Sequence, residues 1–173
     1  MVISGLPELF FKEDVMGFNF NADNIFEMAE EIERNGSKFY KDAAEKISDE
    51  ALKKLLTSLS SMEVAHEKTF KDMRSKLDQN EKTSKIFDPY DEEILYLQSL
   101  ADTKIFFKKE INLSSAKEVL LAAFTAEKES ILFYQGMKNF VPEHIGKKWV
   151  DSIIDEEKKH IVLISNELKK LHK

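Results

Sequence analysis

The chain contains no cysteine, and only 3 of its 173 residues are proline and 5 are glycine. The absence of cysteine excludes disulfides, thiolate zinc sites and thiol catalysis. Because proline and glycine punctuate local structure, their scarcity favours long helices. The sequence also lacks any run that approaches the roughly 18 apolar residues of a membrane span. We therefore expect a helical protein with no membrane partner.

A strong excess of either charge is also missing. Lysine and arginine number 26 against 32 acidic residues, which gives a net charge of −6 without any basic block. This balance argues against nucleic acid as a partner. The apolar patch from Leu9 to Phe11 lacks a basic start and runs into Glu13 and Asp14, so we expect no signal peptide and a cytoplasmic location. The length suits one domain over residues 1–173.

Apolar residues recur at helical spacing in four long stretches of the sequence. The first helix is expected to start near Asn21 to Asn24, and the second to follow Ser48 as its N-cap. Ser115 and Glu118 have the spacing of a capping box at the start of the third helix. Pro142 suits the start of the fourth, since a first helical turn tolerates proline.

A crossover of about residues 75–114 separates the two pairs of helices. Its polar run over residues 78–84 indicates a loop, and Asp88-Pro89 indicates a turn. Apolar positions from Ile94 to Phe106 then predict one short amphipathic helix. The predicted fold is therefore an all-α four-helix bundle over about residues 22–171, built from two helical hairpins joined by a long crossover.

Two sets of identical residue types are related by one offset. Each member of the second set follows its counterpart by 94 residues, and Phe39 and Phe133 obey the same offset. The chain is therefore interpreted as two copies of one helical hairpin. The first set is Glu33, Tyr40, Glu63 and His66, and the second is Glu127, Tyr134, Glu157 and His160.

The spacing within each hairpin brings the glutamates together. Glu33 and Glu63 lie 15 residues on either side of Ser48, and Glu127 and Glu157 lie 15 on either side of Pro142. At about 1.5 Å of rise per residue, each pair sits roughly 22 Å from its turn, near the middle of the bundle. Each carboxylate interrupts an apolar stripe, and the Glu-x-x-His spacing places both side chains on one helix face.

Acidic and imidazole groups inside a bundle need a chemical reason, because buried charges are costly unless they are paired or bind metal. Four carboxylates carry a charge of −4, which two divalent cations would cancel. One glutamate from each of two helices, with Glu-x-x-His from each of the others, is the pattern of di-iron and di-manganese carboxylate bundles. The predicted ligands of two iron ions, or of manganese or another divalent metal, are Glu33, Glu63, His66, Glu127, Glu157 and His160.

Two neighbouring glutamates compete for ligand positions. Glu30 lies one turn before Glu33, but its counterpart in the second half is phenylalanine. Glu156 lies four residues before His160, but its counterpart in the first half is Met62. The repeat therefore favours Glu33 and Glu157 as the ligands.

Two alternatives stay open at this point. Tyr40 and Tyr134 either hold ligand carboxylates through their hydroxyls or pack in the core as plain aromatic residues. A single Glu-x-x-His is a weak signal, so a metal-free bundle with surface salt bridges is the alternative to the metal site.

The segments 28–40 and 62–66, with 126–134 and 156–160 in the second half, resemble the rubrerythrin branch of the ferritin-like superfamily. The resemblance covers about residues 22–171. It implies a di-iron oxidoreductase that reduces peroxide or oxygen with oxidation of Fe²⁺, and it implies a homodimer. The alternative functions are an iron-handling protein without dedicated peroxidase activity and a metal-free structural bundle.

The sequence departs from that family at two points. Full rubrerythrins carry a cysteine-ligated iron domain that feeds electrons to the di-iron site, whereas this chain has no cysteine. An enzyme of this kind would therefore need an external electron donor. Those proteins also have an extra glutamate one turn beyond the third-helix ligand, where this chain has Ser130. The metal shift that the family links to peroxide reduction is thereby called into question.

Overall fold

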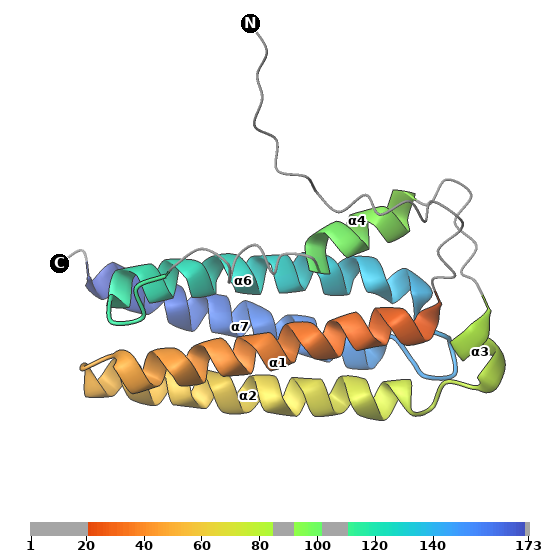
Figure 1. Cartoon of the computed structure of the whole chain (residues 1–173), viewed down its shortest axis with the longest axis horizontal. Coiled ribbons are helices and arrows are strands. Elements are labelled where there is room, and N and C mark those ends of the chain that lie inside the picture. Colours follow the sequence, from red (N-terminus) through yellow and green to blue (C-terminus); the bar gives the residue numbers. More distant parts are fainter. Residues whose placement is uncertain (1–20, 85–91, 102–110, 172–173) are drawn as a thin grey trace, which may run out of the picture.

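Four long helices form a bundle of two hairpins in the computed structural model, which describes residues 21–84, 92–101 and 111–171. The first hairpin is α1 (Ala22–Lys46) with α2 (Glu50–Arg74), and the second is α6 (Ala116–Met137) with α7 (Lys148–Lys170). α2 and α6 run in the same direction, so the crossover has to return along the length of the bundle (Figure 1). The described ranges contain no strand. The predicted all-α bundle of two hairpins is confirmed.

Two of the predicted helix starts are confirmed. Asn21 caps α1 in a reciprocal capping box, because Asn24 N–H donates to the Asn21 side chain at 3.0 Å and Asn21 N–H donates back at 3.2 Å. Ser115 caps α6 and accepts from Glu118 N–H at 3.4 Å. The predicted reciprocal bond is missing there, since the Glu118 carboxylate accepts from Asn112 N–H at 3.2 Å instead.

The other two predicted helix starts are wrong. Asp49, not Ser48, caps α2 and accepts from Leu52 N–H at 2.8 Å; its carboxylate also suits the positive end of the helix dipole. α7 begins at Lys148 and not at Pro142. The Pro142 carbonyl accepts from Ile145 N–H at 3.1 Å and from Gly146 N–H at 3.2 Å in a separate turn, which ends at Gly146 with a φ of 87°. Only glycine adopts that left-handed conformation without strain.

The crossover contains a helix that the sequence pattern did not predict. The polar run forms α3 (Gln79–Thr83), where Asp78 and Glu81 make a reciprocal capping box. Five polar residues carry no apolar periodicity, so only the caps could have signalled this helix. α4 (Glu92–Ala101) agrees with the predicted amphipathic helix and buries Ile94 and Leu97. The predicted Asp88-Pro89 turn and the positions Ile105 and Phe106 lie outside the described residues.

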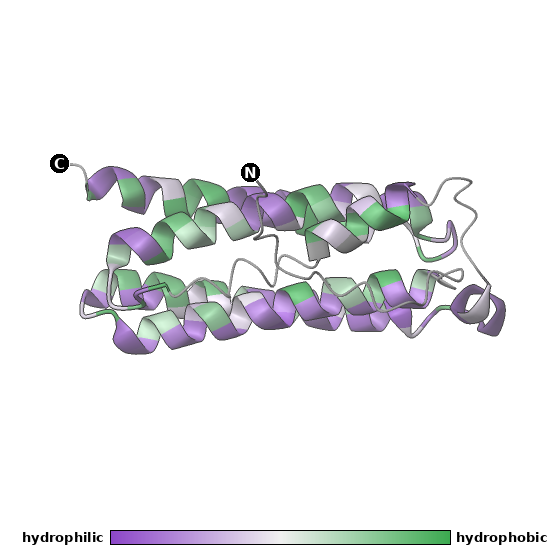
Figure 2. Ribbon diagram, turned by 45° about the horizontal axis from the view of Figure 1, so that its top comes forward, coloured by the Kyte–Doolittle hydropathy of each residue, from purple (hydrophilic) through white to green (hydrophobic). Residues whose placement is uncertain are grey.

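Each long helix carries hydrophilic and hydrophobic residues along its whole length (Figure 2). No described helix combines the length and the apolar content needed to cross a membrane. The buried apolar residues form two clusters, one around Phe26 and Phe70 and one around Leu56 and Leu120. Burying each such side chain contributes about 1.5–3 kcal/mol. The two clusters come from opposite ends of the long helices, so they leave the mid-helix glutamates and histidines between them.

α4 packs against α6 at a glycine. A β-carbon added at Gly136 would lie only 2.7 Å from Cδ2 of the fully buried Leu97. We expect Gly136→Val to lower the free energy of unfolding by about 1–3 kcal/mol through overpacking. Urea unfolding measures this cost, which should shrink in a Leu97→Ala background that frees the space. An equal cost in both backgrounds would contradict the packing explanation.

Candidate metal centre

The six predicted ligands come together in the middle of the bundle, and all of them are buried. They form two overlapping groups in which one ligand atom from each residue lies within 4.8 Å of the others. Position 1 consists of Glu33, Glu63, His66 and Glu157, and position 2 consists of Glu63, Glu127, Glu157 and His160. Glu63 and Glu157 belong to both positions.

In position 1, three carboxylates from three helices surround Nδ1 of His66. The distances from this nitrogen are 3.5 Å to Glu33 Oε2, 3.4 Å to Glu63 Oε2 and 3.0 Å to Glu157 Oε1. Position 2 repeats the arrangement around Nδ1 of His160. There the distances are 3.2 Å to Glu63 Oε1, 3.5 Å to Glu127 Oε1 and 2.8 Å to Glu157 Oε2.

Glu63 and Glu157 therefore each direct one oxygen to each position. Glu63 turns Oε2 toward His66 and Oε1 toward His160, and Glu157 turns Oε1 toward His66 and Oε2 toward His160. The two imidazole rings are nearly parallel, with centroids 5.6 Å apart. Such an arrangement could hold two cations that share Glu63 and Glu157, each with one histidine and one terminal glutamate, Glu33 or Glu127, of its own.

The two tyrosines connect the halves of the repeat. The Tyr40 hydroxyl of α1 donates to Glu127 Oε1 on α6, and the Tyr134 hydroxyl of α6 donates to Glu33 Oε1 on α1. Both rings are buried, and Tyr134 also packs against Phe70 with centroids 5.0 Å apart. The tyrosines thus combine the two alternatives that the sequence left open, since they pack in the core and also contact the terminal carboxylates.

A group of buried polar atoms in this centre makes no hydrogen bond. Among the described residues, every such side-chain atom belongs to this centre: Glu63 Oε1, His66 Nδ1, both carboxylate oxygens of Glu157, and both ring nitrogens of His160. Buried polar groups are normally paired, because an unpaired one costs free energy. Cations between these atoms would satisfy all of them except the outer nitrogen of His160, and oxygen and imidazole donors suit iron or manganese. The residues therefore fit a pair of divalent metal ions.

Burial and mutual repulsion shift the protonation of the terminal glutamates. Burial raises the pKa of Glu33 well above its ordinary value, and the nearby Glu63 charge adds to the shift. Burial, followed by the Glu157 charge, raises the pKa of Glu127 to about 8. The two terminal carboxylates therefore retain protons over a pH range in which exposed glutamates are ionised.

The pKa values of the two histidines are also raised, but for a different reason. Burial lowers the pKa of His66, but the nearby carboxylates of Glu157, Glu33 and Glu63 outweigh burial and raise the pKa above its ordinary value. Burial likewise opposes the effect of the nearby carboxylates of Glu127, Glu157 and Glu63, which raise the pKa of His160 to about 12. Without metal, protons on these groups balance the carboxylate charge, so metal binding has to displace protons.

These shifts predict that the metal-free protein loses stability as the pH rises. A glutamate or histidine whose pKa is higher in the folded state stabilises that state fully below its unfolded pKa and loses the effect as the pH passes the folded value. For Glu127 this window runs from about 4.5 to about 8, and for His160 from about 6.5 to about 12. We expect the free energy of unfolding to fall by a few kcal/mol between pH 5 and pH 9, at about 1.36 kcal/mol per pKa unit. Denaturant unfolding in the presence of a chelator measures it.

The Glu127→Gln variant is the control for this pH dependence. It removes one titrating group and keeps a side-chain oxygen for Tyr40, whose hydroxyl donates to Glu127 Oε1 in the native chain. Its stability should fall less between pH 5 and pH 8 than that of the parent protein. An unchanged slope would show that Glu127 does not bind a proton in the folded state.

The two competing glutamates lie outside both metal positions. Glu30 is buried but forms an ion pair with Arg74 at 3.5 Å, and the same arginine makes two short bonds to Asp23. Glu156 is half exposed, and its Oε2 lies 2.8 Å from Nε2 of His66. Sequence reasoning missed the contact of Glu156 with His66, because the repeat places Met62 at the counterpart of Glu156 and so sets this residue aside.

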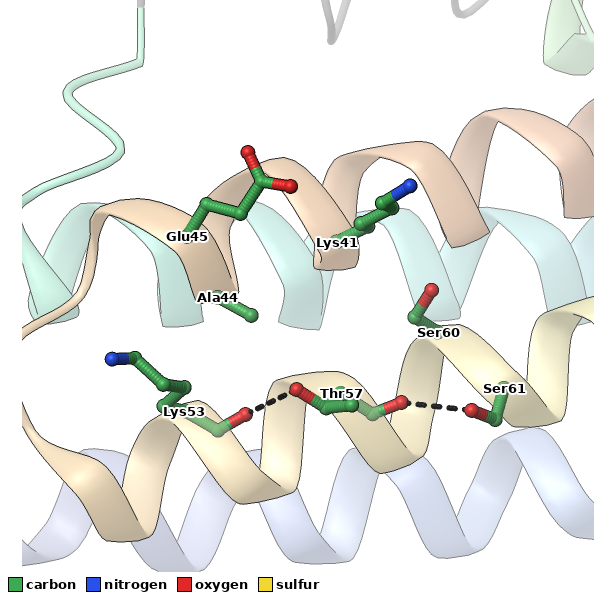
Figure 3. Close-up of a pocket in the computed structure, with 7 residues that line it drawn as sticks. All are labelled: Lys41, Ala44, Glu45, Lys53, Thr57, Ser60 and Ser61. Atoms are coloured by element: carbon green, nitrogen blue, oxygen red, sulfur yellow. Dashed lines mark hydrogen bonds between the residues drawn. The ribbon is translucent and has the colours of Figure 1, made fainter.

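A pocket of about 450 Å³ lies apart from the metal centre, on the surface between α1 and α2 (Figure 3). Its hydroxyl groups already have partners, since Thr57 donates to the Lys53 carbonyl, Ser61 to the Thr57 carbonyl and Ser60 to the Ser37 carbonyl. The hydroxyl protons of the pocket are therefore already donated to backbone carbonyls. It is lined by Lys41, Ala44, Glu45, Lys53, Thr57, Ser60 and Ser61.

A four-helix bundle with two hairpins, a long crossover and a central Glu/His cluster defines the ferritin-like class of proteins. The rubrerythrin family model matches residues 24–172, so this chain belongs to the rubrerythrin family. No curated protein sequence matches the chain.

Two solved structures are similar to this fold. A Thermotoga maritima protein described as ferritin-like and diiron-carboxylate is 25% identical, with a TM-score of 0.65 over 87% of this chain and 95% of that one. A hypothetical protein of Pyrococcus furiosus is 20% identical, with a TM-score of 0.61 over 87% of this chain and 90% of that one. Both likenesses extend over most of each chain, which supports the assignment of the fold.

Proposed function

We propose that this protein binds two iron ions at positions 1 and 2 and reduces peroxide or oxygen as Fe²⁺ is oxidised. The observation that carries the proposal is the sharing of Glu63 and Glu157 by both positions. A single ion would fill one position and leave the buried polar atoms of the other position without a partner. Two divalent ions would also balance the four carboxylates, which a single ion would not.

Each residue of the centre has a defined task in this proposal. Glu33 and His66 would hold one ion, Glu127 and His160 the other, and the shared carboxylates both. Tyr40 and Tyr134 keep the terminal carboxylates in orientation, because each hydroxyl donates to one carboxylate oxygen. Iron bound here would supply the electrons for reduction of the oxidant. Glu33 and Glu127, whose pKa is raised in the metal-free protein, would give up their protons when the ions bind.

In this proposal, the electrons that return the iron to Fe²⁺ come from a separate molecule. The chain has no cysteine with which to hold an iron centre of its own of the rubrerythrin type. An external electron donor is therefore part of the proposal. The cytoplasmic location and the homodimer stay predictions from the sequence and the resemblance.

One observation favours a second function, the handling of iron without dedicated peroxidase activity. Ser130 lies where rubrerythrins that reduce peroxide have an extra glutamate, and its hydroxyl donates to the Ala126 carbonyl at 3.1 Å. This position thus supplies no carboxylate toward which an ion could move. Slow oxidation of Fe²⁺ without turnover would suit such a site.

Peroxide turnover separates the two functions. Anaerobically purified protein is loaded with Fe²⁺, and stopped-flow absorbance follows its oxidation by peroxide and by oxygen. Fast peroxide-dependent oxidation that repeats after an added electron donor reduces the iron supports the oxidoreductase. Slow oxidation with no second cycle supports iron handling. Failure to bind iron at all would exclude both functions.

A further inference from the structure

The two metal positions differ in the hydrogen-bond partner of the histidine nitrogen that faces away from the carboxylates. Nε2 of His66 lies 2.8 Å from Glu156 Oε2, whereas Nε2 of His160 is buried and makes no hydrogen bond to any described residue. The repeat shows why, because the counterpart of Glu156 in the first half is Met62. A thioether cannot match a carboxylate as an acceptor for an imidazole N–H. The internal symmetry of the centre is therefore broken at one residue pair.

This asymmetry affects how strongly each histidine would bind a metal ion. Nδ1 of each histidine faces the carboxylates of its position, so Nε2 carries the proton when Nδ1 binds a cation. The Nε2–H of His66 can then donate a hydrogen bond to Glu156. This bond fixes the orientation of the ring and makes Nδ1 a stronger electron-pair donor to the metal. The corresponding N–H of His160 has no such acceptor, and leaving it unpaired and buried weakens metal binding at position 2.

We propose that Glu156 is a positioning residue for His66 and that it makes position 1 the first and tighter of the two metal positions. The inference rests on the proposed metal centre and goes beyond it by ordering the two sites. Partners behind metal-bound histidines typically change metal affinity about 10–100-fold. Glu156 is half exposed, so its carboxylate stays hydrated on one side while it contacts the buried ring. Its replacement therefore leaves no buried charge unpaired.

The test follows the order in which Zn²⁺, a redox-inert probe, fills the two positions. Calorimetry gives the two dissociation constants, and ¹⁵N NMR of the histidine rings shows which ring binds first. The ring signals that Glu156→Gln shifts in the metal-free protein identify His66. We expect His66 to respond first in the parent protein. Because the first ion repels the second in either order, the order of the rings decides the question.

Two matched variants exchange Glu156 and its repeat counterpart Met62. Glu156→Met should weaken binding at position 1 about 10–100-fold and remove its priority. Met62→Glu should place a carboxylate behind His160 and tighten position 2. Asp155→Asn removes one exposed charge from the neighbouring position of α7 and should change neither constant.

Three results would overturn the inference: binding at His160 first, simultaneous binding at both rings, or an order that Glu156→Met and Glu156→Gln leave unchanged. Each of these still shows two bound ions and leaves the proposed metal centre intact. Absence of any Zn²⁺ binding would remove the centre together with the inference. Helical circular dichroism of each variant confirms that it folds before it is titrated.

Discussion

Glu63→Ala or Glu157→Ala should abolish binding of both metal ions, whereas Glu33→Ala or Glu127→Ala should remove only one. The difference follows from the geometry, since Glu63 and Glu157 each direct an oxygen to both positions and the terminal glutamates serve one position each. Losing a shared carboxylate also leaves two divalent ions with less charge between them to offset their repulsion. Metal analysis after anaerobic loading with Fe²⁺ and dialysis gives the number of ions bound per chain.

Glu30→Ala is the control for this series. Glu30 is a buried glutamate one helical turn from Glu33, but it pairs with Arg74 and belongs to neither metal position. The variant should retain both ions even if it is less stable. Loss of metal in Glu30→Ala, or equal losses in the shared and terminal variants, would contradict the assignment of bridging and terminal carboxylates.

The convergence of six side chains could be predicted because it depends on periodicity and symmetry. An offset of 94 residues and equal distances from the two turns fix which residues of a hairpin face each other. Errors of a few residues at the turns do not disturb this relation. α7 begins at Lys148 and not at Pro142, yet Glu157 still meets Glu63 and His160.

Features outside the repeat could not be predicted in the same way. The cap of α2 is Asp49 and not Ser48 because both neighbours are good capping residues and the local backbone decides between them. The contact of Glu156 with His66 joins helices from different hairpins. The repeat gives no signal for this contact, because the counterpart of Glu156 in the first half is Met62.

Metal should reverse the effect of the terminal glutamates on stability. Without metal at pH 8, the double variant Glu33→Gln/Glu127→Gln should be more stable than the parent protein by about 1–4 kcal/mol, because burial penalises both carboxylates. With metal at about 1,000 times its dissociation constant, the parent protein should gain about 4 kcal/mol for each ion bound. The variant, which lacks both terminal ligands, should gain little and become the less stable of the two.

Thermal unfolding with chelator and with Mn²⁺ measures this reversal, at about 2–4 °C per kcal/mol for a chain of this size. A purely structural bundle would show the first half of the result without the second, because its glutamates would be costly in every condition. If metal stabilises parent and variant equally, the ions bind elsewhere and the cluster is not their site. The sign of the stability difference between parent and variant therefore distinguishes buried glutamates that bind metal from buried glutamates that only destabilise the fold.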